Sequence, residues 1–258
     1  MSRAIGDAWS RCLRAALLGP LVLFAAPTWC AEITVLSAAA VQSPLSDMAQ
    51  QFERATGNRV RFEFSTGGGV DARLKAGARP DLVMNDRLRL DQLAADKLIA
   101  TAAPRDLGTV KIGVALRKGG VRPDLSSVET FSESLQKAQS VAYGDPQRGA
   151  TTGIHFAKVL ERLGLLDAVK AKSLLAANGL EVMKLVVSGE AELGITQISE
   201  ILHIQADCLV GPLPQELQLS TTYSVSLGSD AAPPEARRFV ELLLGPAGRE
   251  RFAHAGFR

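Results

Sequence analysis

Three short segments of the sequence, residues 37–40, 65–69 and 149–153, combine Ser or Thr with Ala or Gly. Each follows an apolar run and precedes an amphipathic one, so each is predicted to be a turn from a strand into a helix. Free backbone amides at the start of a helix carry the positive end of the helix dipole, and they can bind an anion that small side chains allow to come close. The alternative is that Thr66 and Thr152 are ordinary helix N-caps and that the glycines only serve the turns.

The three turns supply the first candidate ligand-binding residues. These are Ser37, Ala39, Ser65, Thr66, Gly67, Thr151 and Thr152. Arg117 and Arg148 are further candidates, because a guanidinium group binds a carboxylate through two parallel hydrogen bonds and both residues lie near predicted turns. The alternative for each arginine is an exposed surface charge.

Histidines and carboxylates give one candidate for proton transfer and none for a metal. His155 lies one turn into the helix predicted after residue 152 and is the candidate catalytic base, with Asp81 and Asp86 as alternatives. His155, His203 and His254 lack a second ligand at a helical or zinc-finger spacing, so we expect no metal site. The sequence has no nucleophile elbow, phosphate-binding loop or dinucleotide fingerprint, so we expect no cofactor.

The segments that must position these residues alternate between two periodicities. Val60, Phe62 and Phe64 alternate with charged residues, as in a half-buried strand, whereas Leu45 and Met48 begin a helical spacing. Strands are expected at residues 33–36, 60–64, 80–84, 111–117, 140–143, 191–196 and 223–227, and helices near 45–55, 70–76, 88–98, 152–163, 179–186 and 236–244. This alternation predicts an α/β fold with parallel-rich sheets, helices on both faces, and a ligand beyond the carboxyl ends of the strands.

The first 30 residues differ from the rest of the chain. Arg3, Arg11 and Arg14 precede an apolar run at residues 15–26, which is the pattern of a secretory signal peptide; an anchor that is never removed is the alternative. A cleaved signal peptide predicts a periplasmic protein. Cleavage near residue 30 would leave 26 basic residues (29 minus three arginines) and 26 acidic ones (27 minus Asp7), so any attraction for an anion must be local.

Two classes of protein are disfavoured by the composition. Cleavage would leave Cys208 as the remaining cysteine, so a disulfide-stabilised exported domain is not expected. No basic stripe interleaves with aromatic residues, which make up 5% of the chain, so a nucleic-acid partner is not expected.

Several segments resemble, in order along the chain, the periplasmic molybdate-binding protein family. They are residues 33–40, 52–57, 80–83, 188–194 and 242–257. The resemblance implies a type II periplasmic binding protein, in which two α/β lobes, each a mixed sheet flanked by helices, close around a small anion. It also implies a monomer that works with the permease of an ABC transporter.

The resemblance divides the chain into lobes. After a signal peptide at residues 1–30, lobe one would comprise residues 31–110 and 223–258. Lobe two would comprise residues 111–222, joined to lobe one through crossover strands.

The ligand is where the sequence departs from this family. Molybdate receptors bind through serine and tyrosine hydroxyls, and the matching positions here are Ala40, Gly67 and Gln197. Gln197 is therefore a candidate ligand-binding residue, and the missing hydroxyls favour an organic acid over molybdate. We expect a solute-binding protein of an ABC importer; because the sequence also resembles periplasmic aconitate isomerase, the alternative is an isomerase acting on a tricarboxylate such as aconitate.

Overall fold

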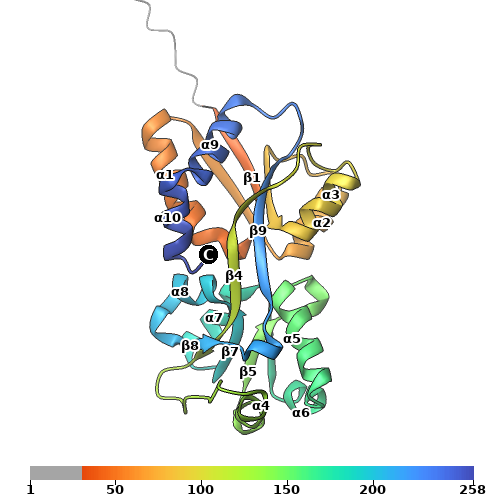
Figure 1. Ribbon diagram of the computed structural model, residues 1–258, viewed down its shortest axis with the longest axis vertical. Helices are drawn as coiled ribbons and strands as arrows, with labels where there is room; N and C mark the ends of the chain where they lie inside the picture. Colours follow the sequence, from red (N-terminus) through yellow and green to blue (C-terminus); the bar gives the residue numbers. More distant parts are fainter. Residues whose placement is uncertain (1–30) are drawn as a thin grey trace, which may run out of the picture.

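The computed structural model describes residues 31–258, and the signal peptide predicted at residues 1–30 lies outside them. The described chain forms two α/β lobes, one above the other in Figure 1, which two long strands connect. The two-lobed α/β architecture expected from the sequence is confirmed. No helix in this part of the chain is both long and apolar enough to span a membrane.

Strands and helices alternate through both lobes. The strands are β1 (Glu32–Ala38), β2 (Arg59–Ser65), β3 (Leu82–Asp86), β4 (Arg105–Leu116), β5 (Val141–Gly144), β6 (Ser173–Ala176), β7 (Leu193–Gln197), β8 (Leu209–Pro212) and β9 (Ser220–Leu227). The helices are α1 (Gln42–Thr56), α2 (Gly67–Lys75), α3 (Arg87–Ala95), α4 (Val128–Lys137), α5 (Thr151–Arg162), α6 (Leu166–Lys170), α7 (Gly179–Ser188), α8 (Ile198–Gln205), α9 (Pro234–Leu244) and α10 (Pro246–His254). Short 3-10 turns include η1 (Ala39–Val41) and η2 (Pro146–Arg148).

Lobe one is built on the parallel strands β2, β1 and β3, with β9 antiparallel beside β3. Successive residues of a strand face opposite sides of the sheet, so Val35 and Leu36 enter different clusters. Val35 packs with residues of α1, α9 and α10, and Leu36 with residues of α2 and α3. Figure 1 shows these two groups of helices on opposite sides of the sheet.

The strands β4 and β9 connect the lobes. From Arg105 to Lys111, β4 pairs with β9 in lobe one's sheet, and from Ile112 to Leu116 it pairs with β7 in lobe two. A single strand therefore belongs to both sheets, which is the arrangement of a hinge (Figure 1).

Lobe two places β5 in parallel between β6 and β7. Phe156 of α5 packs edge to face on Tyr143 of β5, with ring centroids 5.1 Å apart. Met183 and Val186 of α7 pack on the other face of the sheet. Parallel strands end at one edge, so the loops after β5 and β7 meet the loops after β1 and β2 between the lobes.

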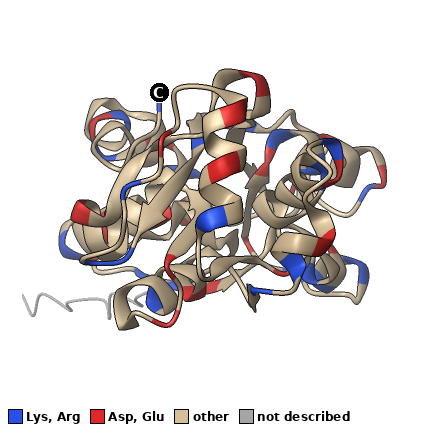
Figure 2. Cartoon of the chain, turned by 90° about the horizontal axis from the view of Figure 1, so that it is seen from below, with Lys and Arg blue, Asp and Glu red and all other residues tan. Residues whose placement is uncertain are grey.

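The surface carries both signs of charge. Figure 2 shows basic and acidic residues interspersed along the helices that surround the sheets.

Candidate functional site

A small cavity lies where the two lobes meet, and its free volume is about 30 Å³. The lining residues are Ala38, Ala39, Ala40, Ser65, Thr66, Gly67, Ala150, Thr151, Thr152, Asn178, Gly179, Gln197, Glu200 and Tyr223. The turns after β1, β2, β5, β6 and β7 supply most of them, and Tyr223 comes from the hinge strand β9. The cavity therefore lies beyond the carboxyl ends of parallel strands, where ligands of such folds bind.

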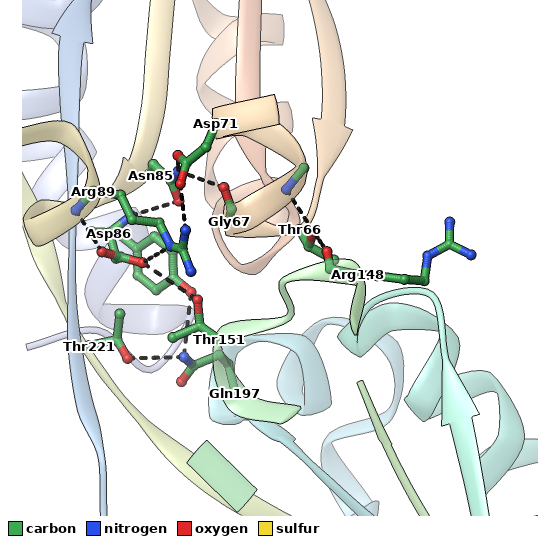
Figure 3. Close-up of polar contacts among 12 residues, drawn as sticks. Thr66, Gly67, Asp71, Asn85, Asp86, Arg89, Arg148, Thr151, Gln197 and Thr221 are labelled. Carbon is green, nitrogen blue, oxygen red and sulfur yellow. Dashed lines mark hydrogen bonds and ion pairs between the residues drawn. The ribbon is translucent and has the colours of Figure 1, made fainter. Parts of the chain in front are cut away.

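Thr66 both caps a helix and crosses between the lobes. As the N-cap of α2, its Oγ1 accepts a hydrogen bond from the Gly69 amide at 3.0 Å. The same hydroxyl donates to the carbonyl oxygen of Arg148 at 2.5 Å (Figure 3). The capping alternative and the site interpretation are therefore compatible at this residue.

The start of α5 has no side-chain cap. Its N-cap is Ala150, and Thr152 is the second residue inside the helix rather than the N-cap considered from the sequence. Thr151 Oγ1 lies 3.5 Å from Asp86 Oδ2 in lobe one. The first backbone amides of α5 consequently border the cavity without a competing side-chain oxygen.

Hydrogen bonds join the lobes on both sides of the hinge strands. The Gly68 amide donates to the Gly149 carbonyl at 3.0 Å, beside the Thr66 contact. On the side of α8, Ser199 Oγ donates to the Ala40 carbonyl at 2.8 Å. The cleft is therefore closed in this conformation.

Glu200 places a carboxyl group in the closed cleft. The residue is 5% exposed, and its Oε2 accepts hydrogen bonds from the Thr196 hydroxyl and from the Gln197 amide, the latter at 3.2 Å. Burial raises the pKa of Glu200 to about 7, although the bonds from Thr196 and Gln197 act in the opposite direction. This carboxyl can therefore gain or lose a proton near neutral pH.

Gln197 has one end of its side chain unpaired. Its Nε2 lies 3.3 Å from Thr221 Oγ1 and 3.4 Å from the Tyr223 hydroxyl, while its buried Oε1 has no hydrogen-bond partner. Burial raises the pKa of Tyr223, and the nearby Glu200 carboxyl raises it further. Tyr223 is therefore a neutral hydroxyl, and Gln197 has a free position for a ligand.

An ion cluster lies behind the start of α2 (Figure 3). Arg89 contacts Asp71 at 2.5 Å and Asp86 at 3.0 Å, and Asn85 Nδ2 donates to the Gly67 carbonyl at 2.9 Å. Burial raises the pKa of Asp71, which the adjacent guanidinium lowers in turn. Two carboxylates thus compensate Arg89, and no arginine, lysine or histidine in the described part of the chain lines the cavity.

Seven of the candidate residues from the sequence meet at the cavity. They are Ala39, Ser65, Thr66, Gly67, Thr151, Thr152 and Gln197. Ser37 does not line it, because its side chain is fully buried and its hydroxyl donates to the Ala38 carbonyl at 3.1 Å.

The remaining candidates lie elsewhere. Arg117 reaches Gln139 and the Gly189 carbonyl on lobe two. Arg148 contributes only its carbonyl, and its guanidinium points away from the cleft in Figure 3. His155 Nε2 lies 2.8 Å from the Leu217 carbonyl, outside the cavity lining.

The alternative bases have structural partners. Asp81 accepts hydrogen bonds from the amide and the hydroxyl of Thr34, at 2.8 and 2.7 Å. Asp86 is the N-cap of α3 and binds Arg89.

Glu200, Tyr223, Asn178 and Gly179 are lining residues that the sequence did not indicate. The signal for Glu200 was its spacing from Gln197, because Glu200 is the third residue of α8 and its carboxyl accepts a hydrogen bond from the Gln197 amide at the helix start. That pattern predicts a helix start, but the burial of Glu200 depends on the packing of α7.

Comparisons with known proteins agree with this architecture. Residues 33–258 match the family model described as bacterial extracellular solute-binding protein. The chain is 32% identical to an aconitate isomerase from Pseudomonas sp over 231 residues, covering 86% of each chain. It is 28% identical to the molybdate-binding protein ModA of Escherichia coli (strain K12) over 228 residues, covering 88% of each chain.

Solved structures show the same fold. The periplasmic molybdate-binding protein of Azotobacter vinelandii superposes with a TM-score of 0.71 at 21% identity, over 88% of this chain and 98% of that chain.

Proposed function

Because the chain belongs to the bacterial extracellular solute-binding protein family, we propose that it is the periplasmic receptor of an ABC importer and that its lobes close around a small organic acid. The expected partner is the permease of that importer. The observation that carries the choice of ligand is Glu200, a carboxyl group in a cleft that is lined by no cationic side chain of residues 31–258.

Neutral hydrogen-bond donors border the cavity. Ser65, Thr151 and Thr152 provide hydroxyl groups, and the N-termini of α5 and α7 provide backbone amides. The Thr66 hydroxyl and the Gly68 and Gly69 amides are already used by partners within the protein. Amides at helix starts bind carboxylate oxygens without a basic side chain. This set of donors suits one ionised carboxylate group of a small acid.

Molybdate fits the same cleft poorly. By the family resemblance, molybdate receptors carry serine or tyrosine hydroxyls at the positions of Ala40, Gly67 and Gln197. All three of these residues line the cavity here. Each lost neutral hydrogen bond removes about 0.5–1.5 kcal/mol, so several would lower affinity by orders of magnitude. Molybdate also has no proton to donate to Glu200, whereas a hydroxy acid such as L-malate can donate a hydrogen bond to this carboxyl.

Thermal-shift and calorimetric titrations of the purified protein would test this. The probes are succinate, L-malate and trans-aconitate, compared with molybdate, tungstate and sulfate. We expect the largest stabilisation from an organic acid. The largest shift with molybdate or tungstate would contradict the proposal.

The Gly67→Val variant tests whether the organic acid binds in the cleft. A Cβ atom at residue 67 would lie 3.0 Å from Asn85 Oδ1 and 3.1 Å from Thr151 Oγ1, where the two lobes meet. The variant should fold but lose the ligand-induced shift. A shift that survives in this variant would locate binding elsewhere.

A second candidate function is isomerisation of a tricarboxylate such as aconitate. It is favoured by the relative named aconitate isomerase and by Glu200, the one carboxyl among the cavity-lining residues. Glu200 would take a proton from a methylene carbon beside a carboxylate, and a proton would return to the far end of the allylic system as the double bond shifts by one position. No electrons are gained or lost.

Turnover separates the two functions. The protein is incubated with cis- or trans-aconitate in heavy water, and NMR follows the double-bond geometry and deuterium uptake. We expect binding without conversion. If the protein interconverts the two isomers catalytically and Glu200→Gln abolishes this activity, the protein is an isomerase rather than a receptor.

A further inference from the structure

We propose that Glu200 makes acid binding in this cleft proton-linked, so that the cleft selects ligands that present a hydrogen-bond donor to this carboxyl and rejects dianions that lack one. The inference rests on the proposed function of the cleft as a receptor for an organic acid. It adds a specificity-determining residue and a pH dependence.

The geometry of Glu200 leaves one oxygen for the ligand. Oε2 accepts the bonds from Thr196 and Gln197, whereas Oε1 receives none from the residues that the structure describes. The unpaired Oε1 of Gln197 lies in the same lining, in a residue that is 1% exposed. A polar atom buried without a partner costs free energy, so the Gln197 oxygen favours a ligand that donates a hydrogen bond to it, and Glu200 Oε1 is open to the same ligand.

The fold makes room for the carboxyl at a helix start. A Cβ atom on Gly179, the first residue of α7, would lie 1.8 Å from Glu200 Oε2 and 2.1 Å from Thr196 Oγ1. Only glycine allows the carboxyl to occupy this place. Asn178 caps α7 by accepting from the Glu181 amide at 3.1 Å, so the glycine is built into a capped turn.

Among residues 31–258, the surroundings of Glu200 provide no positive side chain. Tyr223 of β9 is the titratable group that faces it, while β7 contributes Thr196 and Gln197. On the other sides α7 contributes uncharged Asn178 and Gly179, η1 contributes alanines, and β4 packs on α8 through apolar contacts at Gly113. On its own helix, His203 is the nearest titratable residue in sequence.

Arg89 does not compensate Glu200. Its guanidinium lies behind Gly67, where Asp71 and Asp86 hold it. An ionised ligand beside an ionised Glu200 therefore meets a like charge at close range in a buried site.

A ligand can avoid this charge repulsion in two ways. An acid with a hydroxyl group can donate a hydrogen bond to Glu200 Oε1. An acid without one binds only after Glu200 takes up a proton, and the ligand in turn raises the proton affinity of the carboxyl, because the two bindings are reciprocally linked.

Isothermal titration calorimetry tests the proposal with succinate, L-malate and trans-aconitate as probes at pH 6 and pH 9, in buffers of different ionisation enthalpy. Because burial raises the pKa of Glu200 to about 7, the affinity for succinate or trans-aconitate should fall about tenfold per pH unit above that value. At pH 9 about one proton should be taken up per ligand bound, whereas at pH 6, where Glu200 is already protonated, the uptake should be close to zero. L-malate should lose less affinity.

Glu200→Gln supplies the decisive comparison. This variant should bind succinate and trans-aconitate with equal affinity at both pH values and without proton uptake. At pH 9 it should bind them more tightly than the unmodified protein does. Glu192→Gln is the matched control, because Glu192 is a buried lobe-two glutamate that accepts from the Gln139 amide and does not line the cavity. It should keep the pH dependence of the unmodified protein.

The outcomes separate this inference from the proposed function. Organic-acid binding that is independent of pH, or a pH dependence that persists in Glu200→Gln, would overturn the inference and leave the receptor standing. If no organic acid binds at either pH, the proposed function fails. The inference concerns acid binding, so it then fails with the proposed function, whereas binding that does not depend on pH overturns the inference alone.

Discussion

Gly68 and Gly149 come from opposite lobes and meet backbone to backbone, with the amide of Gly68 donating to the carbonyl of Gly149 at 3.0 Å. A Cβ atom on Gly68 would lie 2.7 Å from Gly149 Cα, and one on Gly149 would lie 2.6 Å from Gly68 Cα. Gly149 also has a φ of 72°, in the left-handed region that favours glycine. The closed cleft therefore depends on two residues without side chains.

Gly68→Ala should hold the lobes apart. The added methyl group collides with backbone across the cleft, but alanine is a better helix former than glycine inside α2, so the fold should remain stable. We expect weaker ligand binding and a larger radius of gyration in small-angle scattering with ligand present. Gly211→Ala is the control, because its Cβ would lie 3.5 Å from Leu125 Cδ1, an ordinary contact. If the lobes of Gly68→Ala close as in the unmodified protein, close contact between Gly68 and Gly149 is not required for closure.

Gly179→Ala should displace the Glu200 carboxyl without adding or removing charge. Its methyl group would take the space of Glu200 Oε2 and Thr196 Oγ1. We expect loss of ligand binding, and we expect overpacking to lower the free energy of unfolding by about 1–3 kcal/mol. Denaturant unfolding and calorimetry on the same samples measure both quantities. Retained affinity would mean that the position of Glu200 does not matter to the ligand.

Glu200 should make the protein less stable as pH rises. Burial raises the pKa of its carboxyl from 4.5 to about 7, so between these values the folded state binds more protons than the unfolded state. The stabilisation is complete below pH 4.5 and is lost as pH rises through about 7, at roughly 1.4 kcal/mol per pH unit. Urea unfolding of the unmodified protein and Glu200→Gln should therefore diverge by about 3 kcal/mol over this range in favour of the variant. Parallel stability curves would contradict the assigned burial.

His155→Ala should leave ligand binding unchanged. The imidazole contacts the Leu217 carbonyl rather than the cavity, so its removal should cost about 0.5–1.5 kcal/mol of stability for the lost hydrogen bond. Calorimetric affinities of the variant and the unmodified protein should coincide. A large loss of affinity in a folded variant would restore His155 as a site residue.

The architecture could be predicted because its signals are local. Val60, Phe62 and Phe64 alternate along β2, and Gly57 ends α1 in the left-handed conformation that a helix C-terminus favours. The short strands β6 and β8 are partly exposed and too brief to show a period, so the sequence did not reveal them.

The site could be predicted only in part, for a physical reason. The turns at Thr66 and Thr151 can be predicted from their small and hydroxyl-bearing residues, and both turns line the cavity. Side-chain direction is decided by tertiary packing, which is why Arg148 turns outward and His155 reaches Leu217. Glu200 depends on space left by Gly179 on another helix, and no local pattern contains that relationship.

Native mass spectrometry of the protein purified without denaturation tests the central claim most directly, because a closed cleft retains its ligand through gentle isolation. The account predicts an added mass that corresponds to a small organic acid, and this added mass should be absent from Gly67→Val. An adduct with the isotope pattern of molybdenum would contradict it, as would an organic acid retained equally by Gly67→Val.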